Sequence, residues 1–437
     1  MSSSRKRCHV STSTAPPPPL PPDVLLEIVA RSDAVTLIRC AACCKLLRRD
    51  ILSPAFIRRV CSHGAGGAAI VPPRLFGILP SHDPFRAAEY RGIPPPAAFF
   101  SLTHPATTPS AANFSEMHLA PLLSRGGGDP RACFYDPFTS RNGLVALKLR
   151  PTNSRRRKSG ICVYDPMAGD RTLVPDPPGA TNSPPYYQAY VLLTASDGIG
   201  CSFLLLMADF AGLMDASCSI KVQSVSSDDA GGRGKWSPAT SVSCDRSQGS
   251  YRRHSSCSAV VLDGCIHWLM VRSGDIRSDD YLHVLTYKVG AATAGRIELP
   301  MDRLPKSYYG DGGIRLGSTP DGRLTMLFRE TQGLKISVWL RLSADAGWAP
   351  HVVIDVETPL RSLMPEIRPS YPWIRFESLW DRSGVLLFSV VGERDLQGFF
   401  VLDIETKEMH KVDSYVPYGA IPFDVDLESR LLAMKSF

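Results

Sequence analysis

The strongest constraint on the fold of this 437-residue chain is a turn signal that recurs from about residue 131 onward. At five places a glycine preceded by Asn, Asp or Ser lies between two apolar runs: Gly143, Gly198, Gly264, Gly322 and Gly384, in steps of 55, 66, 58 and 62 residues. Asn-Gly and Asp-Gly favour tight hairpins, because both central residues of such a turn must accept a positive φ. The spacing therefore predicts a repeated β-structure.

Each turn belongs to a unit of four extended segments. A further apolar strand follows every hairpin, at 161–164, 220–222, 282–285, 336–339 and 399–402. A polar turn and a fourth extended piece come next, for example at 171–175 and 296–300. Four strands at a period near sixty are typical of propeller blades.

We expect a ring of about six blades. Residues 62–130 contain two short apolar runs, 75–79 and 97–102, and could supply the sixth blade, while the segment 420–432 could close the ring. Closure is favourable because it removes unpaired sheet edges. A pair of β-sandwiches is the alternative architecture, although the regular period favours the propeller.

The segment Leu20–Val60 differs from the rest because it has dense helical patterning. Pro21-Pro22-Asp23 is a helix start, and Val24, Leu25, Ile28 and Val29 share one apolar face at helical spacing. Two further helical pieces follow, then Ser53-Pro54 as a break and a short turn at 56–60. Three helices in about forty residues bury little apolar area, so an apolar face of this piece is expected to serve as an interface.

The order of residues in this segment resembles an F-box. The matching positions run from Leu20-Pro21-x-Asp23-x-Leu25-x-x-Ile28 through Leu37-x-Arg39-Cys40 and Cys44-Lys45 to Ser53-Pro54-x-Phe56. One position departs from the family pattern, since Leu47 stands where an aromatic residue, typically Trp, is usual. A small helical cap on the β-rich part is the alternative interpretation.

The resemblance implies a scaffold that binds a Skp-type adaptor and thereby joins a cullin–RING ubiquitin ligase. Carried over by position, the adaptor-facing or adaptor-supporting residues would be Leu20, Pro21, Leu25, Ile28, Leu37, Cys40, Cys44 and Leu47. The smaller side chain of Leu47 would weaken packing on the adaptor without abolishing it.

The β-rich part is similar to the propeller-like, kelch-like associated domains of large plant F-box families. The runs 263–269 (Asp-Gly-x-Ile-His-Trp-Leu) and 165–169 (Asp-Pro-x-x-Gly) carry that likeness. The expected fold class is α+β multidomain, a small three-helix F-box followed by an all-β propeller-like domain. The expected parts are a disordered tail at 1–19, the F-box at 20–60, a linker and possible first blade at 61–130, and the propeller-like domain at 131–437.

Charge and composition argue against nucleic-acid and membrane partners. The net charge is +7, but residues 1–60 hold ten Lys/Arg and four Asp/Glu and so supply +6, which leaves about +1 for the remainder. The longest apolar run, 203–214, is too short to span a bilayer. The N-terminus has no apolar signal-peptide core, and the twelve cysteines form no paired framework. A cytoplasmic or nuclear location is expected.

No catalytic residue, metal or cofactor is expected. The sequence contains no Walker A, Gly-x-Ser-x-Gly or His-Glu-x-x-His motif. Cys40, Cys43 and Cys44 with Cys61-x-His63 could suggest zinc, but Cys40 and Cys44 are one helical turn apart on an apolar stripe, so packing explains them better. His267 lies in a predicted strand without a recognisable acid or nucleophile nearby.

The expected function is a substrate receptor, with the F-box on the adaptor and the propeller holding a protein substrate whose identity the sequence does not give. Two alternatives remain at this stage. One is a binding protein whose F-box-like segment has lost the adaptor. The other is an enzyme that uses the central channel of the propeller.

Overall fold

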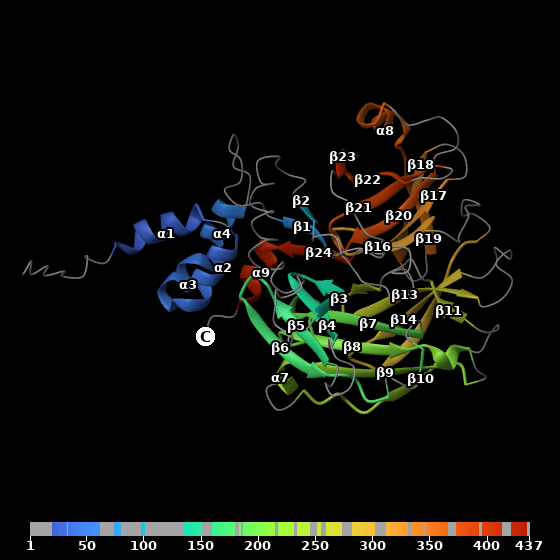
Figure 1. Ribbon diagram of the computed structural model, residues 1–437, viewed down its shortest axis with the longest axis horizontal. Coiled ribbons are helices and arrows are strands. Elements are labelled where there is room, and N and C mark those ends of the chain that lie inside the picture. Colours follow the sequence, from blue (N-terminus) through green and yellow to red (C-terminus); the bar gives the residue numbers. More distant parts are fainter. Residues whose placement is uncertain are drawn as a thin grey trace, which may run out of the picture. The chain divides into compact units, whose positions relative to one another are not determined.

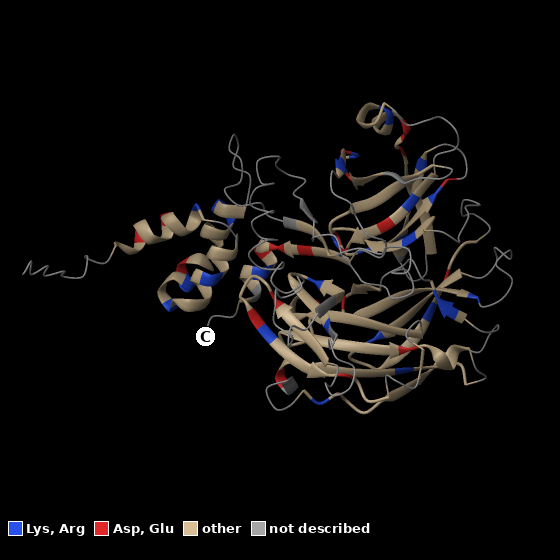
Figure 2. Cartoon of the chain, in the orientation of Figure 1, with Lys and Arg blue, Asp and Glu red and all other residues tan. Residues whose placement is uncertain are grey.

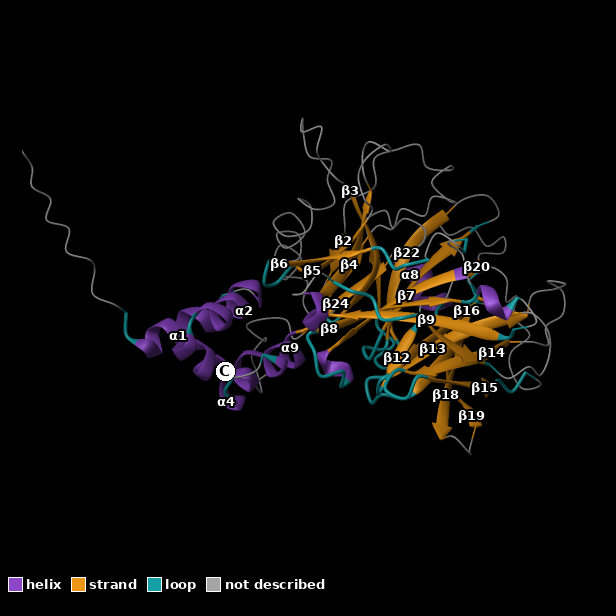
Figure 3. Cartoon of the chain, turned by 90° about the horizontal axis from the view of Figure 1, so that it is seen from below, coloured by secondary structure: helices purple, strands orange, loops and turns teal. Residues whose placement is uncertain are grey.

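The structure is a computed structural model. It describes residues 20–32, 34–61, 74–79, 98–100, 134–150, 160–179, 183–184, 187–214, 217–230, 234–244, 251–254, 259–272, 282–301, 312–330, 334–343, 347–365, 373–392, 396–412 and 421–434. The chain divides into two compact units, one holding the N-terminal helices and the other the strands, and each unit is described by itself (Figures 1 and 3).

The described residues of the first unit form four helices: α1 (Pro22–Ala30), α2 (Ala34–Cys43), α3 (Lys45–Ile51) and α4 (Pro54–Cys61) (Figure 1). Its interior is apolar, and Leu37, Ile51 and Val60 are fully buried. The three expected helices are present, but the expected turn at 56–60 is wrong. Ser53-Pro54 starts a fourth helix, because the Ser53 hydroxyl accepts the Phe56 N–H at 3.3 Å and proline is tolerated in a first helical turn.

Among the described residues, the second unit has five antiparallel sheets that form the blades of the propeller, four with four strands and one with five. The first contains β3 (Phe134–Arg141), β4 (Leu144–Arg150), β5 (Gly160–Asp165) and β6 (Asp170–Pro175). The second contains β7 (Gln188–Thr194), β8 (Phe203–Asp209), β9 (Ser219–Ser226) and β10 (Thr240–Ser243). The third contains β11 (Tyr251–Arg253) and β12 (Val260–Leu262), which both pair with β13 (Cys265–Arg272), then β14 (Leu282–Lys288) and β15 (Thr293–Glu298).

The fourth blade contains β16 (Ile314–Ser318), β17 (Leu324–Arg329), β18 (Lys335–Ser343) and β19 (Gly347–Asp355). The fifth contains β20 (Trp373–Trp380), β21 (Val385–Val391), β22 (Leu396–Asp403) and β23 (Met409–Val412). Short helices are added at η4 (Ala195–Asp197), η5 (Ala211–Leu213), α7 (Ser227–Ala230), α8 (Glu357–Leu363) and α9 (Leu427–Ala433).

The expectation of about six blades is corrected to five. Residues 62–130, expected to form a further blade, contribute two strands among the described residues, β1 (Arg74–Leu79) and β2 (Ala98–Phe100). Both belong to a three-stranded sheet of order β2-β1-β24, whose last strand, β24 (Ile421–Asp426), comes from the far end of the chain. The pairing of Arg74 with Asp426 through Leu79 with Ile421 fastens the two ends of the β-rich unit together.

The repeated turn signal is confirmed. All five glycines lie between the first and second strands of their blades, with φ of 80° at Gly143, 76° at Gly198, 68° at Gly264, 81° at Gly322 and 69° at Gly384. Asn142 and Asp263 also have positive φ, as a two-residue hairpin of this kind requires.

The first strands of the sheets stand next to one another around the centre of the unit. β24 lies beside β3 and β20, β3 beside β7, and β16 beside both β12 and β20. The hydrophobic cores lie between neighbouring sheets; one joins Val191 and Phe210 of the second blade to Trp268 of the third. Another joins Phe76 of the three-stranded sheet to Trp380 of the fifth blade.

Arg141, at the end of β3, links strands from four blades. Its Nη2 and Nε donate to the Asp197 carboxylate at 2.6 and 2.7 Å, its Nη1 donates to Asp381 at 2.7 Å, and its Nη2 also reaches the Val261 carbonyl oxygen at 3.0 Å. These partners belong to the second, fifth and third blades. Burial disfavours the charged form of Arg141, but Asp197 and Asp381 outweigh burial and raise the pKa of the guanidinium. Arg141 therefore stays charged, and each of its three guanidinium nitrogens donates a hydrogen bond to a carboxylate within the fold.

The third blade also holds buried imidazoles. His267 and His283 are both buried in neighbouring strands. Burial lowers the pKa of His267, and burial together with the nearby Arg296 lowers the pKa of His283 to about 3. Both side chains are therefore neutral near pH 7.

Replacing Arg141 by Met should destabilise the propeller unit by about 3–5 kcal/mol, because the fully buried Asp197 and the partly buried Asp381 then lose this counter-charge. Urea denaturation followed by tryptophan fluorescence measures this free energy of unfolding. The matched control is Arg323→Met, since Arg323 pairs with Asp321 at 2.6 Å but both side chains are exposed, and it should change stability by about 0.5 kcal/mol or less. Adding Asp197→Asn and Asp381→Asn to Arg141→Met should recover part of the lost stability. If Arg141→Met alone loses no more stability than Arg323→Met, the role assigned to Arg141 is contradicted.

The free energy of unfolding should fall as the pH drops below about 6.5, because an unfolded imidazole takes up a proton there and folded His283 does not until about pH 3. His283→Phe removes this contribution and keeps a buried aromatic ring. Between pH 7 and pH 5 the variant should lose about 1–2 kcal/mol less than the wild type. The exposed His410→Phe is the control, and identical pH profiles for wild type and His283→Phe would refute the prediction.

Candidate functional site

The first unit carries a line of exposed apolar side chains. Leu20, Val24 and Ile28 recur every fourth residue along α1 and its approach, and their exposed fractions are 52%, 40% and 53%. Leu46 on α3 adds a fourth side chain that is 66% exposed. We call Leu20, Val24, Ile28 and Leu46 the apolar stripe. Large apolar groups that a small unit leaves outside its core are typical of a surface that a partner covers.

The eight residues predicted to face or support an adaptor do not share one environment. Leu20, Pro21 and Ile28 are exposed, whereas Leu25, Cys40, Cys44 and Leu47 are half-buried. Leu37 is fully buried and packs in the interior of the unit. Its place in the sequence pattern therefore reflects support of the helices rather than direct contact with a partner.

Sequence reasoning missed two members of the apolar stripe. Val24 was assigned to the apolar face of α1 but not to the contact set, although its spacing of four from both Leu20 and Ile28 indicated the same line. The F-box pattern marks Leu47, the position of the usual aromatic residue, and gives no signal for Leu46. The structure leaves Leu46 more exposed than its neighbour.

Ion pairs and capping contacts hold the helices beneath the stripe. Glu27 on α1 pairs with Arg31 at 2.9 Å and with Arg59 on α4 at 3.2 Å. Arg48 on α3 donates through Nε to the Ala41 carbonyl oxygen at 2.7 Å, near the end of α2. The helices are thus fastened to one another, so the stripe is presented on a preorganised surface.

The second unit contains a central cavity of about 260 Å³. Its walls come from the inner strands, with Ser140 and Arg141 on β3, Tyr190 on β7, Asp381 after β20 and Asp424 on β24 among them. The cavity has both acidic and basic groups, and Arg141 is held in the ion pairs described above. Basic and acidic residues are interspersed over most of the described strands (Figure 2), while the short β11 carries two adjacent arginines, Arg252 and Arg253.

Among the described cysteines of the first unit, Cys61 is buried, Cys40 and Cys44 are half-buried and Cys43 is exposed. Cys43 donates weakly through Sγ to the Cys40 carbonyl oxygen at 3.7 Å, within the same helix. No group of three or more potential metal ligands occurs among the described residues. His63, part of the zinc alternative, lies outside those residues, so the expectation of no metal stays a prediction.

Within the described part of the chain, each helix is too short or too polar to cross a bilayer.

Two protein families match the chain. Residues 19–58 match the F-box domain, and residues 132–437 match a family described as a domain of unknown function (DUF7595). No curated protein matches the chain.

Several solved structures are similar to the chain at low identity. The periplasmic gluconolactonase PpgL of Pseudomonas aeruginosa is 13% identical, with a TM-score of 0.35 over 78% of this chain and 83% of that one. A protein from Lactobacillus plantarum has the same identity and TM-score over 78% and 81%. An α-L-arabinanase from Penicillium chrysogenum is 13% identical, with a TM-score of 0.33 over 65% and 82%. TM-scores this low assign no function.

The family match extends from residue 132 to residue 437, more than half of the chain, and the F-box match precedes it, so the protein belongs to the DUF7595 family and carries an N-terminal F-box domain.

Proposed function

We propose that this protein is a substrate-recognition subunit of a Skp–cullin–F-box type ubiquitin ligase. The observation that carries the proposal is the apolar stripe on an F-box domain that precedes a separate propeller-like unit. The F-box would dock a Skp-type adaptor, and the propeller would hold a protein substrate through its loops. Loops on a rigid β-scaffold are where binding residues commonly lie.

The size of the stripe suits such docking. Its four side chains are between 40% and 66% exposed, and covering them would contribute roughly 3–6 kcal/mol. A micromolar complex needs about 8 kcal/mol in total, after the cost of association has been met. The half-buried Leu25, Cys44 and Leu47 at the edge of the stripe would supply further contacts. The stripe is thus a substantial part of the interface but not all of it.

In this proposal the chain itself is not catalytic. The substrate would be positioned near a conjugating enzyme supplied by partner subunits, which raises the effective concentration of its lysines. Arg141, which lines the central cavity, is engaged in structural ion pairs, and this supports a non-catalytic role for that cavity. A cytoplasmic or nuclear location belongs to the same proposal. The runner-up is a protein-binding propeller outside any ligase, which adaptor binding tests directly.

Val24→Asp combined with Ile28→Asp should abolish co-purification of the full-length protein with a Skp-type adaptor. Two carboxylates on the stripe would have to be desolvated on docking, while the positions are exposed, so the fold should persist. Pull-down with quantitative immunoblotting and circular dichroism of the free protein provide the two readouts.

The matched control is Ala55→Asp. Ala55 is exposed near the start of α4, where an acidic residue is tolerated, and it is not part of the stripe. This variant should bind like the wild type. If the wild-type protein does not capture the adaptor under conditions where an established F-box protein does, the ligase proposal is wrong.

Leu47→Trp should strengthen adaptor binding about fivefold. An aromatic ring adds apolar contact area at the position where the family usually has one, and such a gain corresponds to about 1 kcal/mol. Titration by isothermal calorimetry or biolayer interferometry measures the change. An unaltered affinity would show that residue 47 does not reach the adaptor.

A further inference from the structure

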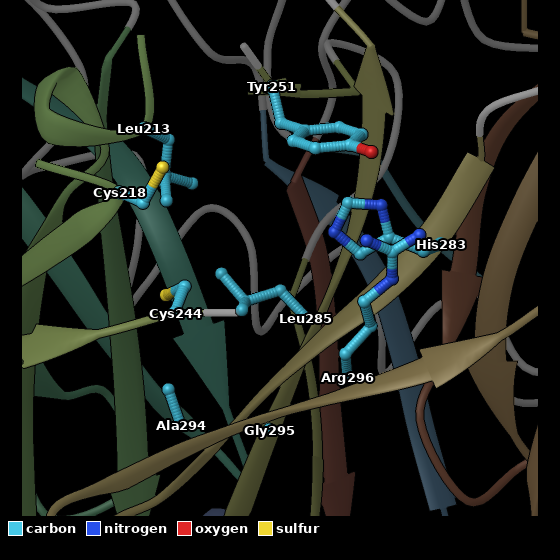
Figure 4. A pocket seen from close by; sticks show the side chains of 9 residues that line it. All are labelled: Leu213, Cys218, Cys244, Tyr251, His283, Leu285, Ala294, Gly295 and Arg296. Atoms are coloured by element: carbon cyan, nitrogen blue, oxygen red, sulfur yellow. The ribbon is translucent and has the colours of Figure 1, made fainter. Parts of the chain in front are cut away.

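A second cavity, of about 90 Å³, lies between the second and third blades. Figure 4 shows that its lining has two different ends. Tyr251, His283 and Arg296 form one end, and Leu213, Cys218, Cys244 and Ala294 form the other, with Leu285 between them. The cavity is separate from the central cavity and from the F-box unit.

Two polar atoms at the first end have no hydrogen-bond partner among the described residues. They are the Tyr251 hydroxyl and Nδ1 of His283, and both side chains are buried. The rings meet edge to face with centroids 4.5 Å apart. Buried polar atoms are rarely left unpaired, because each one costs free energy until a partner is supplied. Both atoms therefore point to a polar ligand group at this end of the cavity.

The charge at this end is positive. The Arg296 guanidinium lies 5.6 Å from the centre of the Tyr251 ring, and His283 beside it stays neutral. Glu298 pairs with Arg296 at 2.6 Å, but its side chain is 70% exposed and it does not line the cavity. A cationic ligand would be repelled here, whereas an anionic oxygen could accept from the Tyr251 hydroxyl, an imidazole N–H and the guanidinium.

The other end favours a short apolar group. Leu213, Leu285 and Ala294 contribute hydrocarbon, and the thiols of Cys218 and Cys244 complete the wall. Burial and the neighbouring Cys218 raise the pKa of the Cys244 thiol to about 11, so it is uncharged. The volume of about 90 Å³ is smaller than the roughly 150 Å³ of a cavity that holds benzene, which limits the ligand to about six heavy atoms.

We propose that this cavity binds a carboxylate carried on a short apolar stem, with the carboxylate at Tyr251, His283 and Arg296 and the stem against Leu285 and Leu213. The same chemistry occurs in a free short-chain acid and in the side chain of a glutamate on a peptide. The site does not depend on adaptor binding, so its test is independent of the ligase proposal.

Butyrate is the probe, titrated into the full-length protein and followed by ligand-observed NMR, with the neutral isostere butyramide as the ligand control. Butyrate should bind, and butyramide should bind at least about tenfold more weakly, the difference expected for a charge-assisted hydrogen-bonded anion. Tyr251→Phe and Arg296→Gln should each weaken butyrate binding about tenfold. Tyr287→Phe is the matched control, because Tyr287 is a buried tyrosine of the same blade that does not line the cavity, and its affinity should equal that of the wild type.

Glu298→Gln provides a change of opposite sign, since removing the competing acid frees the guanidinium and should tighten butyrate binding. A blocked Gly-Glu-Gly peptide tests the source of the carboxylate: binding of the peptide assigns the site to a protein-borne glutamate, and binding of butyrate alone assigns it to a free acid. The proposal is overturned if butyrate does not bind at concentrations up to about 10 mM. It is also overturned if butyramide binds equally well, or if Tyr251→Phe and Arg296→Gln both leave the affinity unchanged.

Discussion

The guanidinium of Arg141 is the interaction on which the β-rich unit most depends. Its partners Asp197 and Asp381 lie far from it in the sequence, and each belongs to a different blade. Hydrophobic packing between neighbouring sheets does not fix the angle between blades around the ring, because such packing is non-directional. A planar guanidinium, whose N–H groups point in fixed directions, does fix this angle. Three acceptors from separate blades can meet it in only one arrangement of the ring. The Gly143 N–H adds a bond of 2.7 Å to the Asp424 carbonyl oxygen next to it.

The two units use apolar side chains in opposite ways. In the propeller unit large side chains such as Trp268 and Phe400 are buried between sheets. The helical unit is too small to enclose all of its apolar residues, so Leu20, Val24 and Ile28 stay outside. In the third blade the first-strand position is divided between β11 and β12, and Tyr251 on the short β11 lines the second cavity.

Local patterns were readable from the sequence, and long-range contacts were not. The glycines at 143, 264 and 384 indicated turns because a positive φ is a property of single residues. The strands around Val163 and Val401 followed from apolar runs of the right length. The fourth helix was missed because Ser53-Pro54 can end one helix and also begin another, and only the bond to the Phe56 N–H distinguishes the two.

The site residues show the same division. The F-box pattern placed Leu20 and Ile28 in the contact set, but it could not tell that Leu37 turns inward, because that depends on how α2 packs against the other helices. The Arg141 ion pairs, and the meeting of Tyr251 with His283 and Arg296, join residues from separate strands that no local pattern relates. The blade count was overestimated because residues 62–130 were counted as a complete unit.

The pairing of β1 with β24 has a consequence for the order in which the molecule is assembled. During synthesis β1 emerges early, and its partner, which pairs Leu79 with Ile421, emerges only after all five blades. Throughout that interval one edge of β1 has no partner strand, and such edges attract the edges of other chains. Contacts between such distant residues also form slowly, because a long loop must close first. Pairing of β1 with β24 therefore ends the period in which the nascent protein exposes this edge to aggregation.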